Sequence, residues 1–311
     1  MKHFRDKTAI VTGGAAGIGR GLCEELARAG AIVVIADIDE EGAQKAAQEI
    51  SSSGGRAVGK RLDVTRDEEI EKVVDETIEE YGRLDYMFNN AGIALMGEVR
   101  DMTLKQARGL VEVNMLGAIN GAIIAYKKMV AQGFGHIVNV GSITGLFTWP
   151  TQTQYSATKH AVQAFSTGLR AEGAALGVKV SVICPMNIKS KMVEGAITVV
   201  GIEDSDWFSK LPARWMDANE AAKKMLKGVA RNKGVIVVPS KARILWWLFR
   251  ISPSLFFRIS LFPSALRVGA KTRVSRISVV EQAIEGERRP GRPPSRALCL
   301  IQLDRKGAPP A

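Results

Sequence analysis

Seven short apolar runs recur along residues 1–239, and a longer amphipathic segment separates each from the next. The runs are rich in β-branched residues and apolar on both faces, as strands are when helices cover both sides of their sheet. The alternation predicts an α/β fold with a doubly wound, mostly parallel seven-stranded sheet and helices on both faces. The predicted strands are "TAIVTG", "AIVVIAD", "AVGKRLDV", "LDYMFNNAG", "HIVNVGS", "KVSVICP" and "GVIVVP", and the predicted helices cover 17–29, 39–53, 67–81, 103–132, 155–176 and 217–232.

Ligands of such folds bind at the carboxyl ends of the strands. We therefore expect functional residues where each run ends. The last predicted helix begins at Asp217, and Glu220 three residues later completes the pattern of a capping box.

The positive charge of the chain is concentrated at its carboxyl end. The net charge is +11, but residues 1–239 hold 29 Lys/Arg and 28 Asp/Glu, whereas residues 240–311 hold 14 and 4. We therefore divide the chain into a main α/β domain (1–239), to which the functional motifs described below belong, and a basic, apolar extension (240–280). The Pro-, Gly- and Arg-rich remainder (281–311) is predicted to be a disordered tail.

Cysteine and histidine are too sparse to indicate a disulfide framework or a metal site. The three cysteines lie far apart without a CxxC motif, and the histidines lack metal-ligand spacing. We expect His3, His136 and His160 to lie on the surface. No signal peptide is recognisable at the N-terminus, so a reduced, cytoplasmic setting is predicted.

A glycine-rich stretch, "TGGAAGIG" (12–19), follows the first predicted strand and opens the first predicted helix. Gly13, Gly17 and Gly19 allow a sharp turn and a close approach to a ligand, and a helix N-terminus favours a pyrophosphate. The alternative is a glycine-rich turn without a ligand. Its position after the first strand favours dinucleotide binding.

Asp37 ends the second predicted strand. A carboxylate there can accept hydrogen bonds from an adenosine ribose and would repel a 2′-phosphate. Ala36 and Ile38 provide no neighbouring cation, so NAD is favoured over NADP. The alternative is a helix N-cap or loop acid, and Asp39 competes for either role.

The stretch "YSATK" (155–159) places a phenol and an ammonium one helical turn apart. On a helix, Tyr155 and Lys159 share a face. A neighbouring positive charge favours the phenolate, so the pair could exchange a proton with an alcohol or alkoxide. The spacing alone also fits an ordinary exposed helix pair.

Taken in order, "TGGAAGIG", "NNAG" (89–92), Asn114, Ser142 and "YSATK" resemble the short-chain dehydrogenases/reductases (SDRs), over residues 5 to about 239. The resemblance implies a Rossmann-type fold and hydride transfer between a nicotinamide and an alcohol or carbonyl. Tyr155 would be the general acid/base, and Lys159 would lower its pKa and bind the nicotinamide ribose. Ser142 would hydrogen-bond the substrate oxygen, and Asn114 would hold a water in a proton relay.

The resemblance also implies a set of cofactor-binding residues, which are Gly13, Gly17, Ile18, Gly19, Asp37, Asp63, Val64, Asn89, Ala91, Gly92, Tyr155, Lys159, Pro185, Ile188 and Ser190. Several of the predicted catalytic and cofactor-binding residues also have simpler interpretations. Asn114 could be an ordinary polar helix residue, Ser142 a loop cap with Thr144 as the alternative hydroxyl, and Asp63 a turn former.

In the run "CPMNIKS" (184–190) the family pattern changes: Met186 replaces the usual glycine, and Ser190 takes the place of a threonine. Methionine disfavours a positive φ beside the nicotinamide. We expect the cofactor to bind, with an altered path for this loop.

The segment 191–216 is apolar and aromatic, and Phe147 and Trp149 are expected near the site. These residues favour a hydrophobic alcohol or ketone, such as a steroid, retinoid or long-chain lipid. The alternative is that they pack on the core or on another subunit. A non-catalytic nucleotide-binding scaffold or sensor is the rival function.

Residues 243–262 interleave aromatic residues with arginines and are too interrupted for a transmembrane helix. They fit an element lying on an anionic membrane, or else an apolar flap or dimer contact. Nucleic-acid binding has only charge in its favour. The family resemblance implies a homodimer or homotetramer with helices near 103–132 and 155–176 at the interface.

Overall fold

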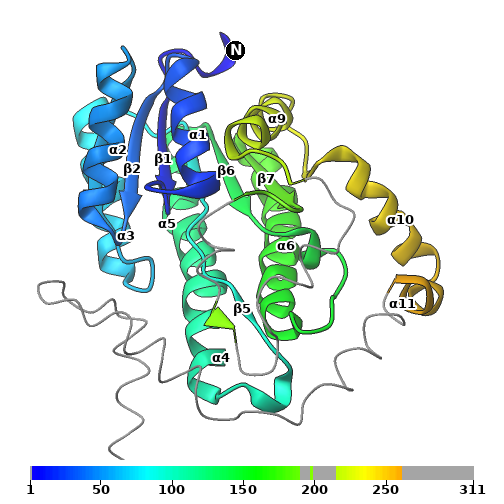
Figure 1. The fold of residues 1–311 in the computed structure, drawn as a ribbon. Helices are drawn as coiled ribbons and strands as arrows, with labels where there is room; N and C mark the ends of the chain where they lie inside the picture. The colour runs from blue at the N-terminus through cyan, green and yellow to red at the C-terminus, as the bar shows by residue number, and fades with distance from the viewer. Residues whose placement is uncertain (1, 190–196, 199–214, 261–311) are drawn as a thin grey trace, which may run out of the picture.

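The computed structural model describes residues 2–189, 197–198 and 215–260, and they form a three-layer α/β domain with a helical extension (Figure 1). The central parallel sheet has the order β3-β2-β1-β4-β6-β7-β9. Every predicted strand is present. The bounds are Thr8–Thr12 (β1), Ile32–Asp37 (β2), Arg56–Arg61 (β3), Tyr86–Asn89 (β4), Gly135–Val140 (β6), Val178–Pro185 (β7) and Val235–Val238 (β9).

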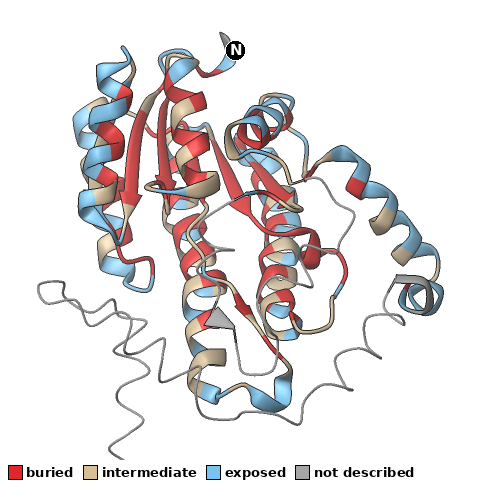
Figure 2. Ribbon diagram, viewed as in Figure 1, coloured by how far each residue is buried: buried red, intermediate tan, exposed pale blue. Residues whose placement is uncertain are grey.

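The helices lie on both faces of the sheet and shield it from water, as the burial colours in Figure 2 show. One apolar core includes residues of α1 (Gly17–Arg28), α2 (Glu40–Ser52) and α9 (Ala218–Ala230). The opposite core includes residues of α3 (Asp67–Tyr81), α5 (Gly117–Gln132) and α6 (Thr153–Gly173). The doubly wound prediction is thus confirmed.

The predicted helix over 103–132 is interrupted by a π-helical segment. It consists of α4 (Leu104–Leu110), the π segment Val111–Leu116 and α5. Thr103 caps it through a capping box with Gln106. Among the described helices, only the span 104–132 has the length and composition to cross a membrane, and α5 contributes buried residues to the core.

A second, two-stranded sheet lies outside the predicted pattern. β5 (Leu95–Met96) pairs in parallel with β8 (Ile197–Thr198). Two-residue strands are too short for a periodicity that a sequence could reveal. This pairing places part of the segment after β7 against the loop after β4.

Two local expectations were wrong. His136 is buried rather than on the surface, and its Nε2 lies 2.8 Å from the Ser181 hydroxyl. Asp217 does cap α9 by accepting from the amides of Asn219 and Glu220. The Glu220 carboxylate, however, pairs with Lys224 at 2.7 Å, so the reciprocal half of the predicted capping box is missing.

After β9 the chain forms two short helices, α10 (Arg243–Ile251) and α11 (Pro253–Ser260), beside the β7–β9 side of the sheet (Figure 1). They pack against a third apolar cluster that includes Phe147 and Val182. The rest of the predicted extension and the tail 281–311 lie outside the described residues.

Candidate active site

The glycine-rich loop joins β1 to α1 and is tightly curled. Gly13 and Gly17 have φ angles of +63° and +55°, which favour glycine. A Cβ on Gly19 would overlap the carbonyl oxygen of Gly13, so no larger residue fits there. The N-cap, Ala16, makes no side-chain cap, which leaves the first-turn amides of α1 available to an anion. Ile18 packs on the core behind the loop.

Two residues that the sequence analysis did not select hold this loop in place. The Asn90 side-chain amide donates to the carbonyls of Thr12 and Gly13, at 2.9 and 3.0 Å. The Thr12 hydroxyl accepts from the amides of Asn90 and Ala91, both at 3.0 Å. A Cβ on Gly13 would lie 2.8 Å from the Ala91 Cα, so the two segments touch. In the sequence, the signal for this contact was the second asparagine of "NNAG", which is Asn90.

The side chain of Asn89 points into the core. Its side chain is buried and donates from Nδ2 to Asn139 Oδ1 at 2.8 Å. Asn139 in turn donates to the Ser166 hydroxyl. The Asn89 side chain therefore belongs to a polar network inside the core, and a contact of this residue with the cofactor stays a prediction. Its neighbour Asn90 faces the loop instead.

Asp37 lies at the end of β2 and faces the glycine-rich loop. Its Oδ2 accepts from the Ala15 amide at 3.0 Å, and its Oδ1 accepts from the Asp39 amide at 3.1 Å. Asp39 is the N-cap of α2, so the capping role belongs to Asp39 and not to Asp37. The strand register adds a cation that the local sequence did not reveal. Arg61 on β3 is the register partner of Asp37 and pairs with Glu69 at 2.8 Å.

Asp63 and Val64 lie just after β3. Asp63 Oδ1 accepts from the amide and the hydroxyl of Thr65, at 3.0 and 2.7 Å, which is the turn-forming geometry considered as its alternative. Val64 is buried against α5, where a Cβ on Gly117 would lie 2.8 Å from its side chain.

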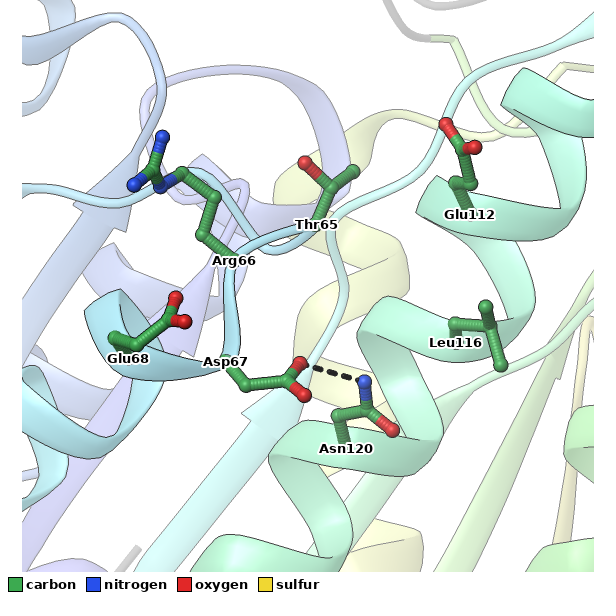
Figure 3. Close-up of a pocket in the computed structure, with 7 residues that line it drawn as sticks. All are labelled: Thr65, Arg66, Asp67, Glu68, Glu112, Leu116 and Asn120. Atoms are coloured by element: carbon green, nitrogen blue, oxygen red, sulfur yellow. Dashed lines mark hydrogen bonds between the residues drawn. The ribbon is translucent and has the colours of Figure 1, made fainter.

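A hollow of about 400 Å³ adjoins this turn. Figure 3 shows the residues that line it, which are Thr65, Arg66, Asp67, Glu68, Glu112, Leu116 and Asn120. Asn120 donates to Asp67 at 2.7 Å and joins the two sides. The four predicted catalytic residues lie elsewhere, so this hollow is not the reaction site.

Tyr155 and Lys159 lie on one face of α6, as the spacing predicts. The Lys159 ammonium is 5.7 Å from the centre of the Tyr155 ring and donates to the carbonyl of Val140 at 3.0 Å. Lys159 is buried, and Tyr155 is half-buried. The alternative of an ordinary exposed helix pair is therefore excluded.

Burial shifts both groups away from their charged forms. It raises the pKa of Tyr155 to about 12, and a hydrogen bond from Ser142 opposes this rise. Burial also lowers the pKa of Lys159 to about 8, which the Cys184 thiol opposes. Burial is thus the largest influence on the pKa of Tyr155, and the lowering of that pKa by Lys159 stays a prediction. At neutral pH the pair is a protonated phenol beside an ammonium group.

Ser142 follows β6, and its hydroxyl acts on the Tyr155 phenol by lowering its pKa. Its hydroxyl accepts from the hydroxyl and the amide of Thr144, at 3.0 and 3.2 Å. Gly145 lets this turn approach α6, since a Cβ there would lie 2.6 Å from the Lys159 carbonyl oxygen. Thr144 thus supports Ser142, whose own proton is left for Tyr155 or for a ligand oxygen.

Asn114 lies in the π segment and is fully buried. It accepts from the Ile93 amide and donates to the Ile93 carbonyl, both at 2.8 Å. A Cβ on Gly92 would lie 3.1 Å from Asn114 and 3.6 Å from the Lys159 nitrogen. The structure therefore brings together the "NNAG" turn, Asn114 and Lys159. The water held by Asn114 stays a prediction.

In the loop after β7, Met186 does not adopt the positive φ angle that methionine disfavours. The positive φ angle, +52°, falls on Asn187, a residue type that tolerates it. The Met186 amide donates to the Val238 carbonyl at 2.8 Å, and Ile188 bridges to Met216. Pro185 ends β7 as expected. Ser190 and most of the segment 191–216 lie outside the described residues.

The Tyr155 ring lies against an apolar wall. Leu95 of β5 and Leu110 of α4 are buried, and Met102 and Tyr155 pack against them. Phe147, by contrast, is buried in the cluster under α10 and α11, with its ring 5.0 Å from that of Phe256. The expectation that Phe147 faces the substrate was wrong, and its packing alternative holds.

These features fit a dinucleotide. The curled loop provides uncapped amides for phosphates, the carboxylate of Asp37 lies beside that loop, and Lys159 and Tyr155 lie after β6, where Lys159 donates to the Val140 carbonyl. Among the residues that the structure describes, no group of His, Cys, Asp and Glu side chains is suited to hold a metal ion.

Fold and site together define a short-chain dehydrogenase. The family model with this description matches residues 7–198. The chain therefore belongs to the short-chain dehydrogenase/reductase family, oxidoreductases that typically use NAD(P).

Among relatives, the SadH protein of Mycobacterium tuberculosis, an oxidoreductase by name, is 33% identical over 264 residues, or 83% of this chain and 95% of SadH. An (S)-acetoin-forming diacetyl reductase of Staphylococcus epidermidis is 34% identical over 187 residues, or 60% of this chain and 73% of that enzyme.

Solved structures share the fold. A short-chain dehydrogenase/reductase from Burkholderia phymatum, in complex with NAD, superposes with a TM-score of 0.74 at 23% identity and covers 82% of this chain and 96% of its own. LigD from Sphingobium sp. strain SYK-6 gives a TM-score of 0.68 at 28% identity, covering 81% and 98%.

Proposed function

We propose that this protein is an NAD-dependent oxidoreductase that interconverts a hydrophobic secondary alcohol and its ketone. One observation carries the proposal. The Ser142 hydroxyl acts on the Tyr155 phenol by lowering its pKa, the Lys159 ammonium lies on one side of the Tyr155 ring, and that ring packs against Leu95 and Leu110. The Tyr155 hydroxyl, which can donate a proton, therefore belongs to a side chain that packs against apolar residues.

The residues of the chain provide the proton chemistry. Bound NAD would accept the hydride from the alcohol carbon, and its reduced form would return a hydride to the ketone. In the reductive direction Tyr155 donates its proton to the carbonyl oxygen, and in the oxidative direction it removes the proton from the hydroxyl. Ser142 donates a hydrogen bond to the same oxygen, and the Lys159 cation favours the negative charge that develops nearby.

The raised pKa of Tyr155 and the lowered pKa of Lys159 both bear on the direction of reaction. At neutral pH the phenol carries its proton, which is the form that reduction needs. Alcohol oxidation needs the phenolate and is therefore expected to require a higher pH. The lysine cation is lost above a pH of about 8 and limits that gain.

The preference for NAD rests on Asp37. Its carboxylate accepts from the Ala15 amide, at the turn that would hold the cofactor's phosphates. A 2′-phosphate on the adenosine ribose would meet this negative charge. Arg61, the neighbouring cation on β3, is paired with Glu69 and is thus partly neutralised.

The preference for a hydrophobic substrate rests on Leu95, Met102 and Leu110 around the Tyr155 ring. The diacetyl reductase among the relatives acts, by its name, on a small diketone, and such a substrate is the contrasting possibility.

The test is a hydride-transfer screen of the full chain with NADH and NADPH. Diacetyl would be compared with steroid ketones, retinal and medium- to long-chain ketones, with absorbance of the reduced nicotinamide as the readout. We expect the highest kcat/KM for an apolar ketone with NADH. Turnover of diacetyl alone would refute the substrate class, and NADH binding without turnover of any carbonyl would favour a nucleotide-binding scaffold.

A further inference from the structure

Helix α10 has two apolar faces, and within the part of the chain that the structure describes, one of them packs on the fold while the other is exposed. Ala242, Leu245, Trp246 and Phe249 follow a helical repeat and pack on the cluster that contains Phe147. The residues of the second repeat are Ile244, Trp247, Leu248 and Ile251, which are between 47% and 76% exposed. Leu255 and Phe257 of α11 extend this outer face and are also exposed.

The charges around the outer face have one sign. Residues 240–260 contain Lys241, Arg243, Arg250 and Arg258 and have no acidic residue. The Arg250 guanidinium lies 5.5 Å from the Trp246 ring and 5.4 Å from the Trp247 ring. It therefore stacks over aromatic rings at the border between the inner and the outer face, and no ion pair with an acidic neighbour in this segment is available to it.

We propose that the outer face of α10, extended by Leu255 and Phe257, docks onto an anionic lipid surface. Exposed tryptophan and branched aliphatic residues beside arginines are the composition of helices that lie in the plane of a membrane interface. The cations would contact lipid phosphates, and each contributes about 1 kcal/mol near such a surface. The nine residues of α10 are too few to span a bilayer, so the helix lies on it.

A second copy of the chain suits this face less well. A two-fold contact brings the same patch of both subunits together. Arg243 and Arg250 would then approach their own copies, and residues 240–260 offer no carboxylate to neutralise them. A surface of phosphate groups satisfies these cations directly.

If the proposed function holds, the position of α10 near the candidate site gives membrane docking a functional role. Its inner face contacts the cluster that Trp149 and Met186 also join. These two residues belong to the loops that follow Ser142 and β7. Docking through α10 would therefore hold the site close to the bilayer, where a lipophilic alcohol or ketone is concentrated.

The test compares binding of the full chain to sedimented vesicles of phosphatidylcholine with and without phosphatidylglycerol. The variant is Trp247→Glu combined with Leu248→Glu, which leaves the inner face intact. The matched control is Leu176→Glu, since Leu176 is 47% exposed and lies before β7. NADH binding verifies that each variant is folded, and it does not depend on turnover.

We expect the wild type and the control to bind the anionic vesicles and the double variant to bind at least about tenfold more weakly, because two large apolar side chains no longer insert. Equal binding by the double variant would overturn the proposal, even if the chain bound vesicles through other basic residues. A double variant with a smaller oligomer but unchanged vesicle binding would assign the face to a contact between copies.

Discussion

The ammonium of Lys159 lies 5.7 Å from the centre of the Tyr155 ring and is fixed there by a 3.0 Å hydrogen bond to the Val140 carbonyl. The carbonyl belongs to the last residue of β6, so the sheet positions the lysine and the lysine faces the phenol. The relative position of the two groups therefore depends on the packing of α6 against the strand and not on α6 alone.

Removing the Tyr155 hydroxyl is expected to abolish turnover and to leave cofactor binding intact. Tyr155→Phe keeps the ring against Leu95 and Leu110 but has no proton to donate, so kcat should fall by about 10²–10⁴. Lys159→Met should lower kcat and also weaken NADH binding. Steady-state kinetics and NADH fluorescence titration measure the two effects. Wild-type kcat in Tyr155→Phe would refute the assignment of the acid/base.

Thr144 is expected to act through Ser142. Thr144→Val removes the 3.0 Å hydrogen bond that orients the Ser142 hydroxyl, while Thr144→Ser keeps it. We expect kcat to fall about tenfold in the valine variant, the equivalent of one hydrogen bond of about 1.4 kcal/mol, with KM for NADH unchanged. Recovery of kcat in Thr144→Ser distinguishes this positioning role from a general loss of packing. Equal kcat in both variants would contradict it.

Asn90 is expected to control the shape of the glycine-rich loop. Asn90→Ala removes both donors to Thr12 and Gly13, so the loop should lose its curled conformation and the Kd for NADH should rise about tenfold. Asn120→Ala is the control, since it removes a side-chain amide donor of the same type, which bonds Asp67 at the hollow beside α3 and not the glycine-rich loop. Fluorescence titration measures both, and an unchanged Kd in Asn90→Ala would contradict the role.

The charge of Asp37 is expected to set cofactor choice. Asp37→Asn removes the repulsion of a 2′-phosphate and leaves Arg61 nearby as a cation. We expect the ratio of kcat/KM for NADPH over NADH to rise at least about tenfold, or about 1.4 kcal/mol. Asp39→Asn is the control, because Asp39 caps α2. A similar ratio in both variants would show that Asp37 does not select the cofactor.

Protonation of buried His136 is expected to destabilise the protein in acid. Burial lowers its pKa from 6.5 to about 3, so the unfolded chain binds this proton more readily than the folded one. Stability should therefore fall as pH decreases from about 6.5 towards 3, by up to about 1.4 kcal/mol per pH unit from this group.

His136→Gln removes this titration. Urea unfolding at several pH values should give a flatter decline below pH 6.5 for the variant, whereas above pH 7 the two proteins should run parallel. Identical slopes below pH 6.5 would show that His136 does not contribute to acid sensitivity.

The fold could be predicted from sequence because its signal is local and repeated. The seven strands of the large sheet and the six long helices follow from periodicity and from glycine or capping residues at their ends. The pairing of Tyr155 with Lys159 was predictable for the same reason, since both belong to one helix.

What the sequence did not reveal depends on contacts between distant segments. Asn89 and Asn90 are adjacent in the sequence, but their side chains bond different parts of the fold. The Asn90 side chain bonds the glycine-rich loop, and the Asn89 side chain bonds Asn139 in the core. The burial of Phe147 follows from the arrival of α11, more than a hundred residues later, and the raised pKa of Tyr155 follows from its surroundings rather than from its neighbour Lys159. Local periodicity contains none of this information.

The π segment Val111–Leu116 lets one continuous helical rod contact both the candidate site and the central sheet. In an α-helix one residue more or less turns all later side chains by about 100°. The wide turn is what allows Leu110 to face the phenol while Ala122 and Met129 face the sheet. A one-residue deletion within 111–116 would therefore change which side of α4 faces the phenol, and it would also displace Asn114 from its hydrogen bonds with Ile93.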